Sequence, residues 1–290
     1  MLAFNIQSLS MKIAIQGGRA SFHDITARYY FGEDIEISEC STFRELCNQL
    51  NDGVVEYAVM AVDNSIAAAI LPNYALIEEY GFKIIGEVYL QIKQYIMCVP
   101  ETTEENIRWV MSHYMALNQC EDYLLSRPMM KRREYHDTAD SAKYIKENKS
   151  QDIAAIASKY ASELYGLKLL DQESIETYKN NFTRFFVLSK DKKFKNEAAN
   201  KATISFRLTD QVGALSKVLK IIVDNEVNLT KIQSLPVFGT ADEYRFHVDC
   251  EWSDYAKFKK SIAINSIVED LKILGEYKKG EFVNDYSHSK

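Results

Sequence analysis

The amino-acid sequence predicts an α/β domain followed by a smaller module of strands and helices. Strand-like and helix-like segments alternate through residues 11–189, which is the pattern of an α/β domain. A charged stretch without hydrophobic periodicity follows at residues 190–200 and is typical of a linker. The pattern changes again through residues 201–280. We therefore expect two domains, 11–189 and 201–280, joined by the linker at 190–200.

Hydrophobic spacing and stop signals define the elements of the first domain. Residues 12–17 form a short apolar run expected as a buried strand, and the helical spacing within residues 42–53 ends at Gly53. The remaining elements are expected in this order: a strand at 55–62, a helix at 70–81, strand-like chain at 83–100, a strand that continues as a helix at 108–126, and an amphipathic helix at 152–166. We interpret the basic run Lys131–Arg133 as solvated helix or loop.

Strict alternation of apolar and polar residues marks the second module. Every second side chain is apolar in residues 244–252, which indicates a sheet with one covered face, and His247 is expected on the solvent side. The other elements are expected as a strand at 203–208, a helix at 213–227, a helix at 253–264 and a last strand near 272–279. The pattern favours the order βαββαβ of a ferredoxin-like module.

The composition is that of an ordinary globular protein. Apolar residues make up 47% and charged residues 26% of the 290 residues, and the net charge of -6 argues against a nucleic-acid partner. No apolar run has the length of a membrane span and no signal peptide opens the chain, so we expect a cytoplasmic protein without a membrane partner. Five cysteines without a Cys-x-x-Cys pair are typical of reduced intracellular thiols. Residues 1–10 are expected to be an extension that precedes the first strand.

Most motifs of cofactor chemistry are missing. The sequence has no Gly-x-x-x-x-Gly-Lys-Ser/Thr loop, no His-Glu-x-x-His and no Gly-x-Ser-x-Gly. The "QGGRAS" stretch after the first strand lacks the full glycine spacing of a dinucleotide turn, and the histidines have no metal-ligand spacing. We therefore expect neither a metal nor another cofactor.

Small polar clusters at predicted strand ends are the candidate site. In an open α/β sheet the carboxyl ends of strands are where ligands bind. Each cluster alone is more often a helix cap or a turn. The clusters are Ser21-Phe22-His23, Asp63-Asn64-Ser65, Ser112-His113 with Gln119-Cys120, Asp137-Thr138, and Thr183-Arg184-Phe185.

Taken together, the clusters resemble the successive motifs of one family. "SFHDITA", "VMAVDNSIAAAI", "SHYMALNQC", "DTADSA", "AAIASKYASELYGL" and "NFTRFFVL" look like the motifs of prephenate dehydratase, and this resemblance covers nearly all of residues 11–188. The downstream module resembles an ACT regulatory domain, with "GALSKVL" and "NLTKIQSLP" at the expected places. The resemblance implies two lobes like those of type II periplasmic binding proteins, with the active site in the cleft between them.

The family resemblance also implies a reaction and roles for residues. Prephenate would lose water and carbon dioxide to give phenylpyruvate, a step of phenylalanine biosynthesis that needs no cofactor. Thr183 would act as hydrogen-bond donor or acid toward the departing hydroxyl, while Arg184 would hold a carboxylate or have a structural role. The further catalytic candidates are Asn64, Gln119 and Ser112, and the further substrate-binding candidates are Asp63, Ser21, Phe185 and Thr138.

For the second module the resemblance implies self-association, as a homodimer or homotetramer, and phenylalanine as the probable effector. The ligand would lie where a helix begins in one subunit and a strand approaches from its neighbour. The residues implied are Gly213, Ala214, Leu215, Asn228 and Leu229. Gln233 and Leu235 stand where a glutamate and an arginine are usual, which bears on regulation.

Two other functions stay open at this point. Arogenate dehydratase uses the same scaffold on an amino analogue, and one contact to an amine or a keto group decides between the substrates. A catalytically inert amino-acid sensor would combine a similar two-lobed domain with the same module. The retention of Asn64 and Thr183-Arg184-Phe185 argues against a sensor.

Overall fold

The computed structural model of the chain describes residues 10–209, 211–237, 243–264 and 267–284. The chain divides into two compact units. The first comprises the chain up to Ile70, Val88–Phe185 and the segment from Phe282 onward, and the second comprises Leu71–Glu87 and Phe186–Glu281. The predicted mixed α/β fold is confirmed, whereas the boundaries drawn from sequence stay a prediction.

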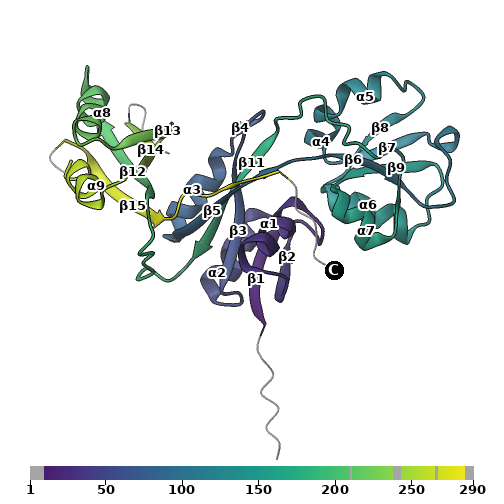
Figure 1. Cartoon of the computed structure of the whole chain (residues 1–290), viewed down its shortest axis with the longest axis horizontal. Helices are drawn as coiled ribbons and strands as arrows, with labels where there is room; N and C mark the ends of the chain where they lie inside the picture. Colours follow the sequence, from purple (N-terminus) through teal and green to yellow (C-terminus); the bar gives the residue numbers. More distant parts are fainter. Residues whose placement is uncertain (1–9, 210, 238–242, 265–266, 285–290) are drawn as a thin grey trace, which may run out of the picture. The chain divides into compact units, whose positions relative to one another are not determined.

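The first sheet contains the first strand of the chain next to its edge. Its order is β16-β5-β11-β3-β1-β2, with β4 paired to β3, and β1 runs parallel to both of its neighbours (Figure 1). Its strands are β1 (Met11–Gln16), β2 (Ile35–Cys40), β3 (Tyr57–Asn64), β4 (Ala68–Ala69), β5 (Lys83–Gln91), β11 (Phe182–Ser189) and β16 (Phe282–Val283). Two helices of the first unit pack on it, α1 (Phe22–Phe31) and α2 (Phe43–Asp52).

The second sheet also belongs to the first unit, and its order is β10-β6-β9-β7-β8. Its strands are β6 (Tyr95–Cys98), β7 (Trp109–Ser112), β8 (Lys131–Glu134), β9 (Ile153–Ala157) and β10 (Lys168–Leu169). Its helical segments are η1 (Glu104–Asn106), α4 (Tyr114–Gln119), α5 (Glu121–Leu125), α6 (Thr138–Glu147) and α7 (Lys159–Tyr165). Figure 1 shows α6 and α7 side by side along this sheet.

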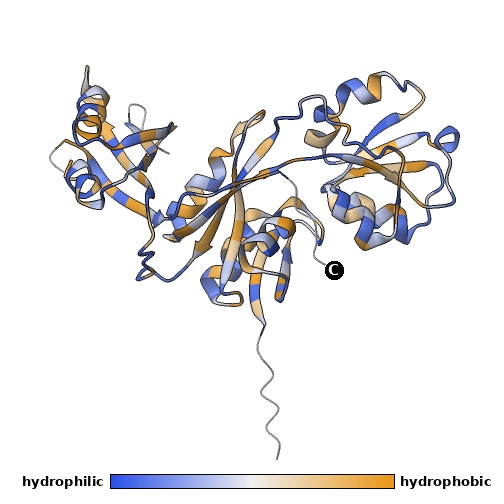
Figure 2. Cartoon of the chain, viewed as in Figure 1, coloured by the Kyte–Doolittle hydropathy of each residue, from blue (hydrophilic) through white to orange (hydrophobic). Residues whose placement is uncertain are grey.

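Two predicted elements of this sheet are wrong. The helix expected at 152–166 is a strand, β9, followed by the shorter helix α7. Every residue of β9 is buried, and these residues carry the hydrophobic colours of Figure 2. Its sequence "IAAIA" is apolar on both faces because β9 lies between two neighbouring strands in mid-sheet, and a run so short fits helix and strand equally. Lys131–Arg133 lies in the exposed edge strand β8, where charged side chains are common, and was expected as helix or loop.

The third sheet lies in the second unit, and its order is β13-β14-β12-β15. Along the chain its elements follow the predicted order βαββαβ. They are β12 (Lys201–Thr209), α8 (Ala214–Asp224), β13 (Asn228–Pro236), β14 (Glu243–Glu251), α9 (Tyr255–Ser261) and β15 (Glu269–Tyr277). The apolar face packs on the two helices, with Phe206 and Val248 from strands against Val218 and Phe258 from helices. Helix α3 (Leu71–Tyr80) belongs to the same unit.

The polar face of the third sheet is buried, so the expectation that His247 faces solvent is wrong. His247 is 1% exposed, and its Nε2 atom lies 2.7 Å from Oε1 of Glu78 in α3. The other carboxylate oxygen of Glu78 lies 3.1 Å from Nη1 of Arg245. Burial would raise the pKa of Glu78, but hydrogen bonds from His247 and Ser205 and the charge of Arg245 hold it at about 2. A helix from a distant part of the sequence covers this face, which strand alternation alone does not reveal.

Helix α6 ends in a hydrogen-bond pattern that normally contains glycine. Asn148 is the C-cap, Lys149 follows with φ +47°, and the Ser150 N–H donates to the Ile145 carbonyl oxygen over 3.1 Å. The Lys149 N–H donates to the carbonyl oxygen of Lys146. This is a Schellman motif with a side chain in the left-handed region, where a Cβ atom is strained.

We predict that Lys149→Gly raises the free energy of unfolding by about 1 kcal/mol, because glycine adopts a positive φ without strain. The matched control is Lys143→Gly, which replaces another exposed lysine by glycine inside α6. This variant should lower the free energy of unfolding by about 1 kcal/mol. Urea unfolding of both variants measures the two changes. Equal destabilisation by both exchanges would contradict the strained helix end.

Candidate active site

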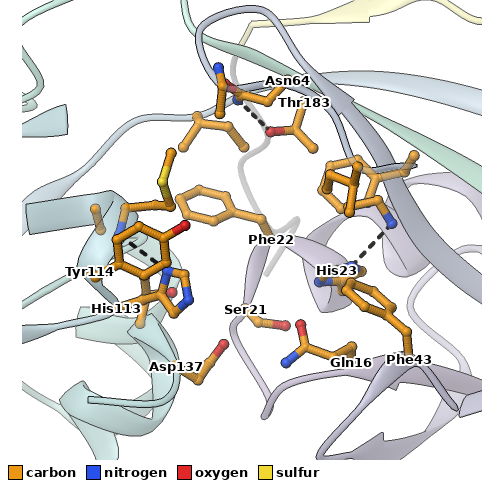
Figure 3. A pocket seen from close by; sticks show the side chains of 18 of the residues that line it. Gln16, Ser21, Phe22, His23, Phe43, Asn64, His113, Tyr114, Asp137 and Thr183 are labelled. Carbon is orange, nitrogen blue, oxygen red and sulfur yellow. Dashed lines mark hydrogen bonds between the residues drawn. The ribbon is translucent and has the colours of Figure 1, made fainter. Parts of the chain in front are cut away.

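A cavity of about 840 Å³ in the first unit is lined by side chains from the first and second sheets and their helices. All five polar clusters of the sequence contribute to it (Figure 3). The residues contributed by these clusters are Ser21, Phe22, His23, Asn64, His113, Gln119, Asp137, Thr138, Thr183 and Phe185. Strands and helix starts that are far apart in the sequence therefore meet at one site.

Asn64, at the end of β3, uses both halves of its side-chain amide. Its Oδ1 atom accepts hydrogen bonds from the backbone N–H groups of Ile66 and Ala67, at 2.9 and 2.8 Å. Its Nδ2 atom donates to Oγ1 of Thr183 over 2.9 Å and to Oδ1 of Asn181 over 2.8 Å. Backbone N–H groups only donate, so the amide has one possible orientation.

This orientation fixes the role of the Thr183 hydroxyl. Because Oγ1 accepts a hydrogen bond from Asn64, the hydroxyl hydrogen points to another acceptor. Figure 3 shows Thr183 beside Asn64 at the cavity wall, and the residue is 9% exposed. Thr183 is therefore placed to donate a hydrogen bond to a molecule in the cavity.

Strand alternation separates Arg184 from its neighbours in β11. Thr183 and Phe185 line the cavity, and Arg184 is not among the lining residues. Arg184 is 3% exposed, its Nη1 atom lies 3.4 Å from Oδ2 of Asp63, and its guanidinium lies 5.5 Å from the ring centre of Tyr89. Asp63 is also absent from the cavity lining. The structure thus places both of these predicted substrate-binding residues outside the cavity.

Ser112 is placed differently from the other catalytic candidates. It is fully buried, its hydroxyl donates to the carbonyl oxygen of Ile156 over 2.7 Å, and it does not line the cavity. The next residue, His113, does line it, and its Nδ1 atom accepts a hydrogen bond from the Met115 N–H. Burial lowers the pKa of His113, which favours the neutral ring.

Four helices begin at the cavity. The capping side chains of α1, α2, α4 and α6 all line it, and none of the described lining residues is a lysine or an arginine. These capping residues are Ser21, Thr42, His113 and Asp137. A helix start carries partial positive charge, which favours an anion nearby, whereas the Asp137 carboxylate at the start of α6 opposes one.

Asp137 lies close to Gly17, the residue that follows β1. Its Oδ1 atom accepts hydrogen bonds from the N–H groups of Ala139 and Asp140, at 2.8 and 3.1 Å, and burial raises the pKa of Asp137 to about 6. A Cβ atom on Gly17 would lie 2.7 Å from Oδ2 of Asp137, and Gly17 has φ +90°. Glycine is therefore required where β1 meets the start of α6.

Sequence reasoning missed several lining residues. Gln94 is 2% exposed, lies between two strands and donates from Nε2 to Oε1 of Gln119 over 3.3 Å. Gln16 and Tyr114 also line the cavity. In the sequence, these lining residues are polar residues that follow or interrupt an apolar run. Such residues are too common to identify a site. In the described part of the chain no group of three or more His, Cys, Asp or Glu side chains could hold a metal ion, and no helix could cross a membrane.

Comparison with known proteins decides the family. Residues 13–193 match the sequence family described as prephenate dehydratase. The chain belongs to the prephenate dehydratase family. The bifunctional chorismate mutase/prephenate dehydratase of Escherichia coli (strain K12) is 30% identical over 276 residues, a match that covers 92% of this chain and 71% of that protein. Arogenate dehydratase 2 of Petunia hybrida is also 30% identical and covers the same shares.

Solved structures share the fold of this prephenate dehydratase family member. A protein described as a novel type of quorum-quenching acylase is 26% identical with a TM-score of 0.81, and the match covers 92% of this chain and 98% of that one. Prephenate dehydratase from Arthrobacter aurescens, solved in complex with L-Phe, has a TM-score of 0.81 at 22% identity, covering 92% and 90%. The Staphylococcus aureus enzyme has a TM-score of 0.80 at 24% identity, covering 92% and 100%.

His23 should make stability depend on pH. Its Nε2 atom accepts a hydrogen bond from the Ala61 N–H over 3.2 Å, its ring packs against Phe43 and Phe185, and burial lowers its pKa to about 3. The folded state therefore keeps this ring neutral, while the unfolded state binds a proton below about pH 6.5. Stability is lost as the pH falls through this window, by about 1.4 kcal/mol per pH unit.

We predict that His23→Gln reduces the slope of the unfolding free energy against pH by about 1.4 kcal/mol per pH unit between about pH 6.5 and 4.5. Urea unfolding across the window measures the slope. His136→Gln, which removes a largely exposed ring that also lines the cavity, is the matched control. An unchanged slope in His23→Gln would show that His23 does not stay neutral in the folded protein.

Proposed function

We propose that this protein converts prephenate to phenylpyruvate, carbon dioxide and water. The observation that carries the proposal is the Thr183 hydroxyl, which is held as a donor by Asn64 at the wall of the cavity. Family membership supports the same reaction. The product phenylpyruvate would serve phenylalanine biosynthesis.

The chemistry asks for orientation more than for strong reagents. The C1 carboxylate leaves as carbon dioxide, its bonding electron pair enters the ring, and the C4 hydroxyl takes one proton from the solvent and leaves as water. Aromatisation drives these steps, so a hydrogen bond to the departing oxygen and a fixed substrate pose are the main requirements. Thr183 supplies that hydrogen bond, because a threonine hydroxyl is too weak an acid to transfer its proton fully. No metal or other cofactor takes part in this proposal.

Substrate anions would be held by the helix starts. Prephenate carries two carboxylates, and the cavity wall offers the beginnings of α1, α2, α4 and α6, with Ser21 and Thr138 among the polar groups. Phe185 and His23 supply an apolar wall for the ring. Arg184 would support the site by holding Asp63 behind the strand, and because it does not line the cavity it is not proposed to hold a substrate carboxylate.

Arogenate is the alternative substrate, since some relatives bear the name arogenate dehydratase at the same identity as the bifunctional enzyme. An inert amino-acid sensor is the alternative from another class. The proposed donor geometry at Thr183 favours an enzyme, because a sensor needs no donor at a departing hydroxyl. The two-lobed likeness to type II periplasmic binding proteins is part of this proposal.

We also propose that residues 201–280 form an ACT regulatory domain that binds phenylalanine and associates into a homodimer or homotetramer in the cytoplasm. Helix α8 begins after Gly213, which has φ +81° and open space around its Cα, and Ala214 and Leu215 form its first turn. Asn228 and Leu229 open β13, with Asn228 exposed. The L-Phe complex of the Arthrobacter aurescens protein agrees with an effector of this kind.

The wild-type protein should turn over prephenate in the presence of a chelator, with phenylpyruvate measured by its ultraviolet absorbance in alkali. We predict that Thr183→Ala lowers kcat about a hundredfold or more with little change in KM, because the lost hydrogen bond forms mainly in the transition state. Thr183→Ser should keep part of the activity. The same measurement with arogenate decides between the substrates.

The matched control is Thr102→Ala. Thr102 does not line the cavity, and its hydroxyl donates to the carbonyl oxygen of Gln151. This control should keep kcat near the wild-type value. Substrate binding without turnover by the wild type would favour the sensor. A Thr183→Ala variant with wild-type kcat would reduce Thr183 to a structural residue.

Phenylalanine should bind the wild type in calorimetric titration and inhibit turnover. Gly213→Val should weaken binding at least about tenfold, because a branched side chain would fill the space next to the start of α8 and strain its positive φ. Gly32→Val is the matched control, since Gly32 has φ +89° and equally open surroundings in the other unit. Absent binding to the wild type would end the regulatory proposal and leave the catalytic one in place.

A further inference from the structure

Gln94 is held in the cavity wall by its own backbone. Its N–H donates to Oε2 of Glu176 over 2.8 Å, and its carbonyl oxygen accepts from the Ile175 N–H over 2.7 Å. Both backbone groups are therefore paired on the segment that leads back to β11. The side chain has a fixed origin and lines the cavity with only 2% of the residue exposed.

The side-chain amide of Gln94 is only half satisfied. Its Nε2 atom donates to Oε1 of Gln119, while no described group donates to its buried Oε1 atom. Turning both amides over would exchange donor for acceptor and still leave one buried polar atom of Gln94 without a partner. A buried polar atom without a partner destabilises a fold, so its presence at a ligand cavity suggests that a ligand supplies the partner.

Gln94 and Thr183 lie on opposite sides of one backbone hydrogen bond. The Ile92 N–H donates to the Asn181 carbonyl oxygen over 2.7 Å, and the chain from Ile92 to Gln94 leads toward Ile175. Thr183 follows Asn181 by two residues, and both Gln94 and Thr183 line the cavity. A substrate whose departing C4 hydroxyl meets Thr183 would therefore place its side chain on C1 in the same cavity as Gln94.

We propose that Gln94, supported by Gln119, is the specificity-determining residue that reads the α-substituent of the substrate side chain. This inference rests on the proposed function. An amide suits either substituent, because Nε2 donates to a keto oxygen and Oε1 accepts from an ammonium group. The half-satisfied amide of Gln94 would discriminate against a substrate whose side chain has no polar α-substituent, because such a substrate would leave the amide unpaired.

The test compares kcat/KM for prephenate and arogenate in the wild type, Gln94→Glu and Gln94→Met. In Gln94→Glu, the ratio of arogenate to prephenate should rise about tenfold or more, because a carboxylate attracts ammonium and repels an anionic keto acid. In Gln94→Met, kcat/KM should fall about tenfold or more for the better substrate, while the melting temperature stays or rises because the unpaired buried acceptor of Gln94 is removed and Oε1 of Gln119 is only part-buried.

Gln49→Met is the matched control, because the Oε1 atom of Gln49 accepts a hydrogen bond from Ser38 away from the cavity. In this variant kcat/KM for each substrate, and therefore their ratio, should stay unchanged. A Gln94→Met variant with a lower melting temperature and wild-type kcat/KM would make Gln94 a structural residue and overturn the inference. So would an unchanged substrate ratio in Gln94→Glu. Turnover of neither substrate by the wild type would instead overturn the proposed function on which the inference rests.

Discussion

The site depends on the side-chain amide of Asn64, because this one group joins the end of β3 to β11 and sets the direction of a hydroxyl. Both of its polar atoms are paired: the oxygen holds the chain that follows β3, and the nitrogen holds Thr183 and Asn181. Any change in the spacing of β3 and β11 would break at least one of these bonds. Two strands thus hold the Thr183 hydroxyl in one position, which is the constraint that the proposed reaction would require.

The alternation along β11 decides how charge is distributed around that hydroxyl. With Thr183 and Phe185 on the cavity side, Arg184 lies on the other side with Asp63, where its charge is compensated before any substrate arrives. In the proposed function, anion recognition would then be left to the helix starts, whose partial charges are spread around the cavity and carry no long side chain to be ordered. Such an arrangement would hold two carboxylates without a cation whose strong attraction would hold back the carboxylate that has to leave.

The sequence predicted the mixed α/β fold, the order βαββαβ and the set of polar clusters, because these depend on local spacing and on strand ends. It failed where the outcome depends on distant partners. The run "IAAIA" fits helix and strand equally, and only its neighbours β6 and β7 decide for a strand. His247 alternates like a solvent-facing residue, but Glu78 and Tyr74 of α3 contact it. The sequence also does not reveal that the Ser112 hydroxyl donates a hydrogen bond to the Ile156 carbonyl oxygen in β9.

The same dependence on distant partners shapes the second unit. Its sheet has a polar face on which Lys201 is 1% exposed and lies 2.9 Å from Oε1 of Glu87, while Glu78 pairs with His247 and Arg245. Buried ion pairs add little net stability, because desolvation offsets most of their attraction. Their effect is on geometry, since a shifted docking of α3 on this sheet would leave cations buried without a carboxylate. An apolar face would tolerate such shifts, so the charged face selects one arrangement of α3 on the strands, and α3 directly follows Ile70 of the cavity wall in the chain.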